Sequence, residues 1–218
     1  AEQLAHGAPG FAYANLAVRG RLLDGIVDGQ VEPALALRPD LVTISAGGND
    51  LIRPGGDPDA LGDRFEAALA RLSSDGATVV VFAGVDVGFS PVFARIRGKV
   101  AIYNEHIRRA ALRHDAIVAD QWALTELQDA RLWSVDRLHL NALGHHAVAR
   151  MVLDTLRVPH DLQPRVPEPR PAVSPSYRPD TVADGWSTDE VTVRLASVRG
   201  YSHRYDGVPR QDDVAAIH

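Results

Sequence analysis

The sequence predicts a doubly wound α/β fold built on a parallel β-sheet. Short apolar runs alternate with amphipathic helical segments across residues 11–157. The runs are apolar at odd and even positions alike, which is typical of parallel strands that helices cover on both faces. The chain has 218 residues, of which 45% are apolar and 23% charged, so it can bury a good hydrophobic core.

Four strands are expected, one from each apolar run. The runs are 11–18, 41–45, 78–83 and 116–119. Each is short and is followed by glycine or polar residues, as strands that end at the functional edge of such a sheet commonly are. We therefore expect at least four neighbouring strands in one sheet.

Helices are expected between these strands. Three segments carry apolar side chains three and four residues apart, so each presents one apolar stripe. The stripes are Leu61, Phe65, Leu69 and Leu72; Val100, Tyr103, Ile107 and Ala111; and Leu143, Ala147, Met151 and Thr155. Asn141 is placed to cap the last helix. Residues 21–37 are expected to be helical as far as Arg38-Pro39, and residues 1–5 resemble the last turn of a helix.

The composition changes at Val158. Seven of the 14 prolines fall between Pro159 and Pro179, where large apolar residues are nearly absent. This pattern predicts an extended linker over residues 158–189, after a folded domain over residues 1–157. Residues 190–218 regain some strand character at 191–198, but too little to bury a core.

The composition also excludes several functions. The net charge of −5 argues against binding to nucleic acid. The absence of cysteine excludes a disulfide framework, a thiolate metal site and a cysteine nucleophile. No apolar run approaches the ~20 residues that a membrane-spanning helix needs.

The strongest chemical signal lies where ligands bind in open α/β sheets, beyond the carboxyl ends of the strands. Asp136 precedes His139 by three residues in a loop, so its carboxylate can accept a hydrogen bond from Nδ1 of the imidazole. That contact would leave Nε2 free to act as a general base. Gly20 and Asn49 follow the first two strands and could supply a backbone N–H and a side-chain amide to an oxyanion hole.

Each of these residues alone has an ordinary explanation. Glycine and asparagine are favoured in turns, and a loop histidine is often a surface residue. Their joint occurrence at strand ends favours a catalytic site. His106 and His114 lie eight residues apart on one predicted helix without a carboxylate pattern, and we expect both to be solvated.

With these residues, the sequence resembles the SGNH (GDSL-type) hydrolases, a family of esterases and acyl hydrolases. Gly20 matches the glycine of their block II, Asn49 the asparagine of block III, and Asp136 and His139 the D-x-x-H of block V. The resemblance covers residues 1–157. It implies a three-layer, flavodoxin-like parallel sheet, a small-molecule ester as substrate, and catalysis that needs no cofactor and no metal.

One block of the family is absent. The Gly-Asp-Ser turn that carries the nucleophile has no match, and Ser45, Ser90 and Ser134 do not replace it. We expect the nucleophile upstream of residue 1, together with the first strand of the sheet. In the flavodoxin-like order 2-1-3-4-5 that strand would lie between the strands at 11–18 and 41–45. The chain alone is therefore expected to be poorly stable and inactive.

The C-terminal end has a separate resemblance. Residues 197–204 and 207–212 resemble the opening of a PP2C-type protein phosphatase domain, in which an acidic residue at the position of Asp212 lies near two metal ions. We expect neither that metal site nor phosphatase activity here. Two alternatives remain for the first domain: a non-catalytic relic or regulatory module joined to a phosphatase-like domain, and a flavodoxin-like binding domain. The second gives the pair Asp136 and His139 no purpose.

Overall fold

The computed structural model describes residues 1–6 and 8–168. Residues 1–167 form one compact unit. The predicted strand at 191–198 and the phosphatase-like segments lie outside the described residues. No helix in the described part of the chain is both long and apolar enough to cross a bilayer.

The described residues build a three-stranded parallel sheet in the order β1-β2-β3. The strands are β1 Leu41–Ile44, β2 Thr78–Ala83 and β3 Ile117–Asp120. Leu41 lies opposite Thr78 and Val80 opposite Ile117. The central strand is the most buried, because Val79, Val80 and Val81 are enclosed on both faces. Three of the four predicted strands are thus present, within one residue of their expected bounds.

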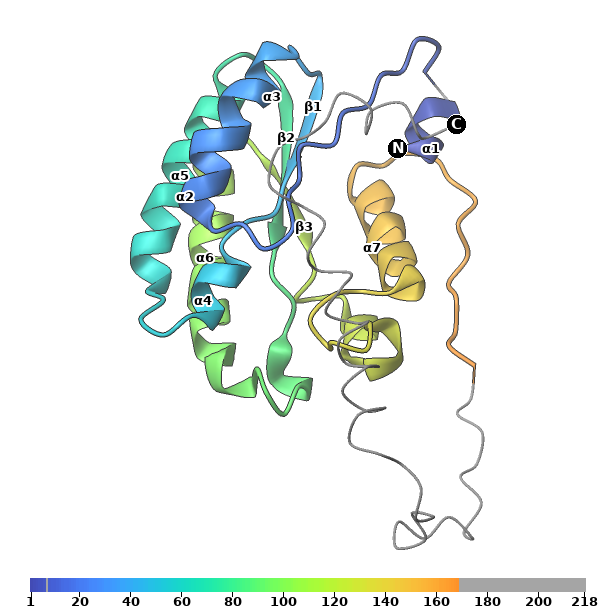
Figure 1. Cartoon of the computed structure of the whole chain (residues 1–218). Coiled ribbons are helices and arrows are strands. Elements are labelled where there is room, and N and C mark those ends of the chain that lie inside the picture. Colours follow the sequence, from blue (N-terminus) through green and yellow to red (C-terminus); the bar gives the residue numbers. More distant parts are fainter. Residues whose placement is uncertain (7, 169–218) are drawn as a thin grey trace, which may run out of the picture. The chain divides into compact units, whose positions relative to one another are not determined.

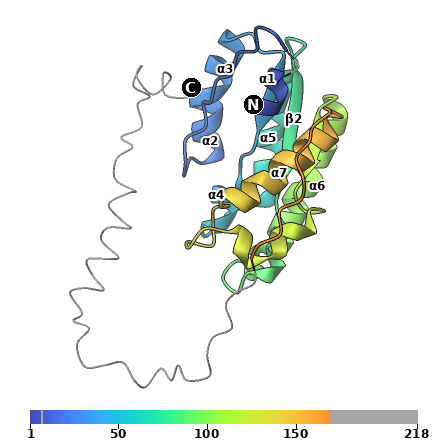
Figure 2. The same cartoon turned by 90° about the vertical axis from the view of Figure 1, so that its right-hand side faces the viewer.

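Helices cover both faces of this sheet (Figures 1 and 2). Figure 1 shows α2, α5 and α6 on one side of the sheet and α7 on the other, and Figure 2 is turned so that α7 faces the reader. The helices are α1 Glu2–His6, α2 Leu23–Ile26, α3 Glu32–Ala36, α4 Gly48–Ile52, α5 Pro58–Ser73, α6 Arg97–Arg113 and α7 Ala142–Thr155. Short helical turns are at Val27–Val31 (π), Val87–Phe89, Ala94–Ile96, Thr125–Gln128 and Ala130–Leu132. The layers confirm the predicted α/β architecture.

The main core lies between the sheet and the helices α5 and α6. Phe65, Leu69 and Ile107 are at most 1% exposed and pack in the same cluster as Val79 and Val81. Each such side chain contributes about 1.5–3 kcal/mol by leaving water. A smaller apolar cluster contains Ala147 of α7 together with Leu127 and Leu132. The predicted apolar stripes of α5 and α6 therefore face the sheet.

Residues 11–18 are where the structure departs from the prediction. They carry no strand assignment and pair with no described strand, and Phe11 and Tyr13 are 37% and 59% exposed. The sheet ends at β1, and the strand expected between residues 11–18 and β1 is not among the described residues, so residues 11–18 lack the ladder partner on which the prediction depends. A strand needs a neighbour for its backbone hydrogen bonds, which an apolar run alone cannot provide.

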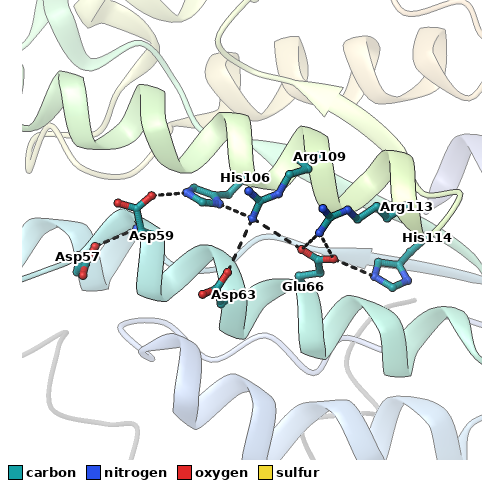
Figure 3. Close-up of polar contacts among 8 residues, drawn as sticks. All are labelled: Asp57, Asp59, Asp63, Glu66, His106, Arg109, Arg113 and His114. Carbon is teal, nitrogen blue, oxygen red and sulfur yellow. Dashed lines mark hydrogen bonds and ion pairs between the residues drawn. The ribbon is translucent and has the colours of Figure 1, made fainter.

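The histidines of α6 also differ from the prediction (Figure 3). The ring of His106 is 12% exposed, and its Nε2 lies 2.7 Å from Oδ1 of Asp59 on α5. Arg109 donates to Nδ1 of the same ring at 2.8 Å. His114 and Arg113 both contact Glu66, at 3.6 and 3.0 Å. The two histidines thus belong to a polar seam between α5 and α6 and are not simply solvated.

Candidate active site

The loop before α7 brings Asp136 and His139 into contact. Nδ1 of His139 lies 2.8 Å from Oδ2 of Asp136. The backbone N–H groups of Leu138 and His139 both donate to Oδ1 of Asp136 at 3.0 Å. The intervening Arg137 has a φ of 57°, the left-handed conformation that turns the chain back on itself. The spacing of Asp136 and His139 therefore produces the contact that it suggested.

Both ends of this loop are anchored. The N–H of Ser134 donates to the carbonyl of His139 at 2.7 Å, and Trp133 and Leu140 form an isolated antiparallel bridge. Asn141 caps α7, because its side-chain oxygen accepts from the N–H of Leu143 and of Gly144. The predicted cap is thus confirmed, and the loop is tied to the start of a long helix.

The electrostatics of Asp136 follow from these contacts. Partial burial of the carboxyl group opposes its ionisation. The N–H groups of His139 and Leu138, and then the ring of His139, donate to it and outweigh that effect, so the pKa of Asp136 falls to about 2. An ionised carboxylate here accepts from Nδ1 of His139 and leaves Nε2 as the ring's acceptor.

Gly20 and Asn49 lie on two turns that are bonded to each other. Gly20 has a φ of 83°, and no atom lies within 4 Å of the place where a Cβ would be. One N–H of the Asn49 amide donates to the carbonyl of Arg21, one residue after Gly20, at 3.0 Å. Oδ2 of Asp50 accepts from the N–H of Leu23 at 3.0 Å and so holds the start of α2. The two turns are therefore fixed as a pair.

Tyr103 of α6 supports the turn that carries Asn49. Its side chain is buried, its hydroxyl donates to the carbonyl of Ala46 at 3.3 Å, and burial raises its pKa above the usual range. Gly47 has a φ of 88°, and a Cβ there would lie 2.4 Å from the Tyr103 hydroxyl. Only glycine fits this turn, which starts α4 and places Asn49 in its first residues.

Arg19 joins the turn of Gly20 to the loop that carries Asp136 and His139. Its Nη2 lies 2.9 Å from Oδ2 of Asp136 and 2.6 Å from Nδ1 of His139, and its Nε lies 3.0 Å from Nε2 of His139. It directly precedes Gly20, so this contact brings the glycine turn to the loop of His139. The sequence did not predict a role at the site for Arg19 or for Tyr103. The cation next to Gly20 is the one local signal for Arg19, and nothing local indicates that Tyr103 supports the turn of Asn49.

No described serine occupies the position of a nucleophile. The described polar partners of the His139 ring are Arg19 and Asp136. The hydroxyl of Ser134 donates instead to the carbonyl of Leu140, and that of Ser90 accepts from the N–H of Phe93. In the residues that the structure covers, no cluster of three side chains could hold a metal ion.

Comparison with known proteins gives one family and several similar folds. Residues 1–147 match the GDSL-like Lipase/Acylhydrolase family. The structure of TesA is 19% identical, with a TM-score of 0.60 over 72% of this chain and 83% of that one. An alpha/beta hydrolase from the metagenome of Lake Arreo is 20% identical, with a TM-score of 0.56 over 64% and 69%. An acetylxylan esterase from Geobacillus stearothermophilus is 19% identical, with a TM-score of 0.54 over 63% and 68%. None of the curated proteins matches the chain.

Proposed function

Because the chain belongs to the GDSL-like lipase/acylhydrolase family, we propose that it supplies the base and the oxyanion hole of a serine esterase of SGNH type. The observation that carries the proposal is the contact between Asp136 and His139, in which the carboxylate is fixed by two backbone N–H groups. A carboxylate on Nδ1 orients the imidazole and stabilises the imidazolium that forms when Nε2 accepts a proton.

The reaction is ester hydrolysis in two steps. A serine hydroxyl attacks the acyl carbon while Nε2 of His139 accepts its proton. The tetrahedral intermediate then expels the alcohol, which receives that proton, and leaves an acyl-serine. Water adds to the acyl-serine by the same route and releases the carboxylic acid. The serine is regenerated, so the reaction consumes one water for each ester.

The oxyanion would be held by Gly20 and Asn49 together with the serine's own N–H. The Asn49 amide has two N–H donors, and one of them is bonded to the carbonyl of Arg21. That bond fixes the amide and leaves the second N–H for the oxyanion. Gly20 has no Cβ, and the place where one would be is open, so no side chain of its own hinders the approach of an acyl oxygen to its backbone N–H.

The nucleophile is proposed to be a serine upstream of residue 1, on a Gly-Asp-Ser turn. This proposal is supported by the family membership and by the lack of a described serine on His139. The chain as given would then not hydrolyse esters. If the natural upstream sequence contains no such turn, the alternative function is favoured, a non-catalytic or regulatory module joined to a phosphatase-like domain.

The test is an ester panel on the protein with its natural upstream sequence. p-Nitrophenyl esters of two to eight carbons, acetylated sugars and thioesters would be compared for kcat/KM. We expect His139→Ala to abolish most of the activity and Asn49→Ala to lower kcat by about 10²–10³-fold, as loss of one oxyanion donor does. His145→Ala, an exposed position on α7, is the control and should leave the rate unchanged. Unaltered hydrolysis by the His139 variant would refute the proposed base.

A further inference from the structure

Arg19 contacts Nε2 of His139, the atom that accepts the serine proton in the proposed reaction. The carboxylate of Asp136 can only accept hydrogen bonds, so Nδ1 of His139 carries the proton between them and Nε2 is the ring's acceptor. Nε of Arg19 lies 3.0 Å from that Nε2. Nη2 of the same guanidinium lies 2.6 Å from Nδ1, so the group lies against both ring nitrogens. While it stays there, it occupies the space beside Nε2 that a serine hydroxyl needs in order to give its proton to the ring. Arg19 must therefore leave His139 before ester hydrolysis begins.

The contact is one that an anion could break. The side chain of Arg19 is 70% exposed and that of Asp136 is 42% exposed, and ion pairs between such exposed groups contribute little because water competes for both partners. Asp136 also keeps three other donors, two from the backbone and one from the ring, when Arg19 departs. The dyad can thus lose the guanidinium without losing the ionised state of its carboxylate.

Arg19 is also the arginine of this turn that faces the dyad. The side chain of Arg21 runs along α2, with its Cδ 3.3 Å from the place where a Cβ of Gly25 would be. Because Arg19 directly precedes Gly20, a guanidinium that leaves His139 stays within one residue of the proposed oxyanion donor. There it could pair with a carboxylate or phosphate group in the bidentate manner typical of arginine.

We propose that Arg19 is a specificity-determining residue that selects esters bearing a negative charge next to the scissile bond. An anionic group on the substrate takes the guanidinium of Arg19 and thereby frees Nε2 of His139. A neutral ester lacks such a group, so the guanidinium continues to compete with the serine for the place beside Nε2. This inference rests on the proposed esterase function, and it assigns a substrate class within it.

The kinetic test compares an anionic and a neutral ester of similar length. p-Nitrophenyl hemisuccinate and p-nitrophenyl butyrate would be assayed with the full-length protein, with Arg19→Gln and with Arg64→Gln. Arg64 is the matched control, because it also forms an exposed ion pair, with Asp24 on α2, outside the proposed site. For Arg19→Gln we expect kcat/KM to fall about tenfold or more on the anionic ester and to rise on the neutral one. Arg64→Gln should change neither.

A binding measurement separates failure of this inference from failure of the proposed function. Succinate, which carries the anion but no ester, would be titrated while NMR follows the ring signals of His139. We expect saturable shifts in the wild type and in Arg64→Gln, and none in Arg19→Gln. If no ester is hydrolysed but succinate still binds through Arg19, the esterase proposal fails and the anion site stands. The inference is overturned if esters are hydrolysed but Arg19→Gln does not lower kcat/KM on the anionic ester and raise it on the neutral one. It is also overturned if Arg19→Gln binds succinate like the wild type.

Discussion

Asp136 shows how much of this site depends on a single side chain. Its carboxylate accepts from the N–H groups of Leu138 and His139, from the ring of His139 and from Arg19. The spacing of Asp136 and His139 was enough to predict their contact, because three residues of loop keep the partners close. Arg19 lies 120 residues from His139 along the chain. No local pattern encodes such a contact, so only the fold could reveal it.

The lowered pKa of Asp136 predicts a pH dependence of stability. A carboxyl group titrates near 4 in an unfolded chain and at about 2 here, so the folded protein holds fewer protons between these values. The contribution of Asp136 to stability is therefore fully present above about pH 4 and is lost as the pH falls toward 2. Urea unfolding of the wild type and of Asp136→Asn would measure it. The difference in unfolding free energy should be constant above about pH 5 and should shrink toward pH 2. A difference that stays the same across this whole range would contradict the prediction.

At the scale of elements, the polar seam between α5 and α6 shows what helical periodicity leaves out. The apolar stripes correctly indicated which face of each helix is buried. They did not indicate that His106 would pair with Asp59, since the two residues lie on different helices, 47 positions apart. The strand expected at residues 11–18 failed for a related reason. Its composition suits a strand, but pairing needs a neighbour that the described residues do not provide.

Close packing at this seam predicts an unusual effect of replacing a glycine in α5. Gly62 is buried in the second turn of the helix, and a Cβ there would lie 2.4 Å from Cγ of the His106 ring. Alanine in place of glycine usually stabilises a helix by up to about 1 kcal/mol. Here the ring must move away from Asp59, and overpacking costs about 1–3 kcal/mol. We therefore expect Gly62→Ala to destabilise the protein in urea unfolding.

Gly98 in the first turn of α6 is the control for that experiment. It is exposed, and nothing lies within 4 Å of its would-be Cβ. Gly98→Ala should be neutral or slightly stabilising, because helix propensity then acts without a clash. If the two substitutions have the same sign and size, the seam is not as tightly packed as the contacts indicate.

For the whole described region, the fold has a firm side and an open side. The firm side is the sheet with α5 and α6, in which β2 is buried on both faces. The open side begins at β1, whose second edge has no described strand, and it includes residues 11–18 with their exposed aromatic side chains. An unpaired edge beside an extended apolar segment is a place where another strand could add. The candidate site lies at this side of the molecule, since Arg19 and Gly20 continue directly from the extended segment.

This asymmetry predicts where a protease will act first. Chymotrypsin needs an aromatic residue in an extended, accessible stretch that is free of strong backbone pairing. Phe11 and Tyr13 meet that requirement, whereas Phe65 and Tyr103 are 1% and 3% exposed within helices of the core. Brief digestion followed by mass spectrometry should therefore show, among the described residues, early cuts after Phe11 and Tyr13. The stretch from α2 through α7 should stay intact at these times. Early cuts after Tyr103 or Phe65 would mean that the core opens as readily as the edge, which would contradict the division into a firm and an open side.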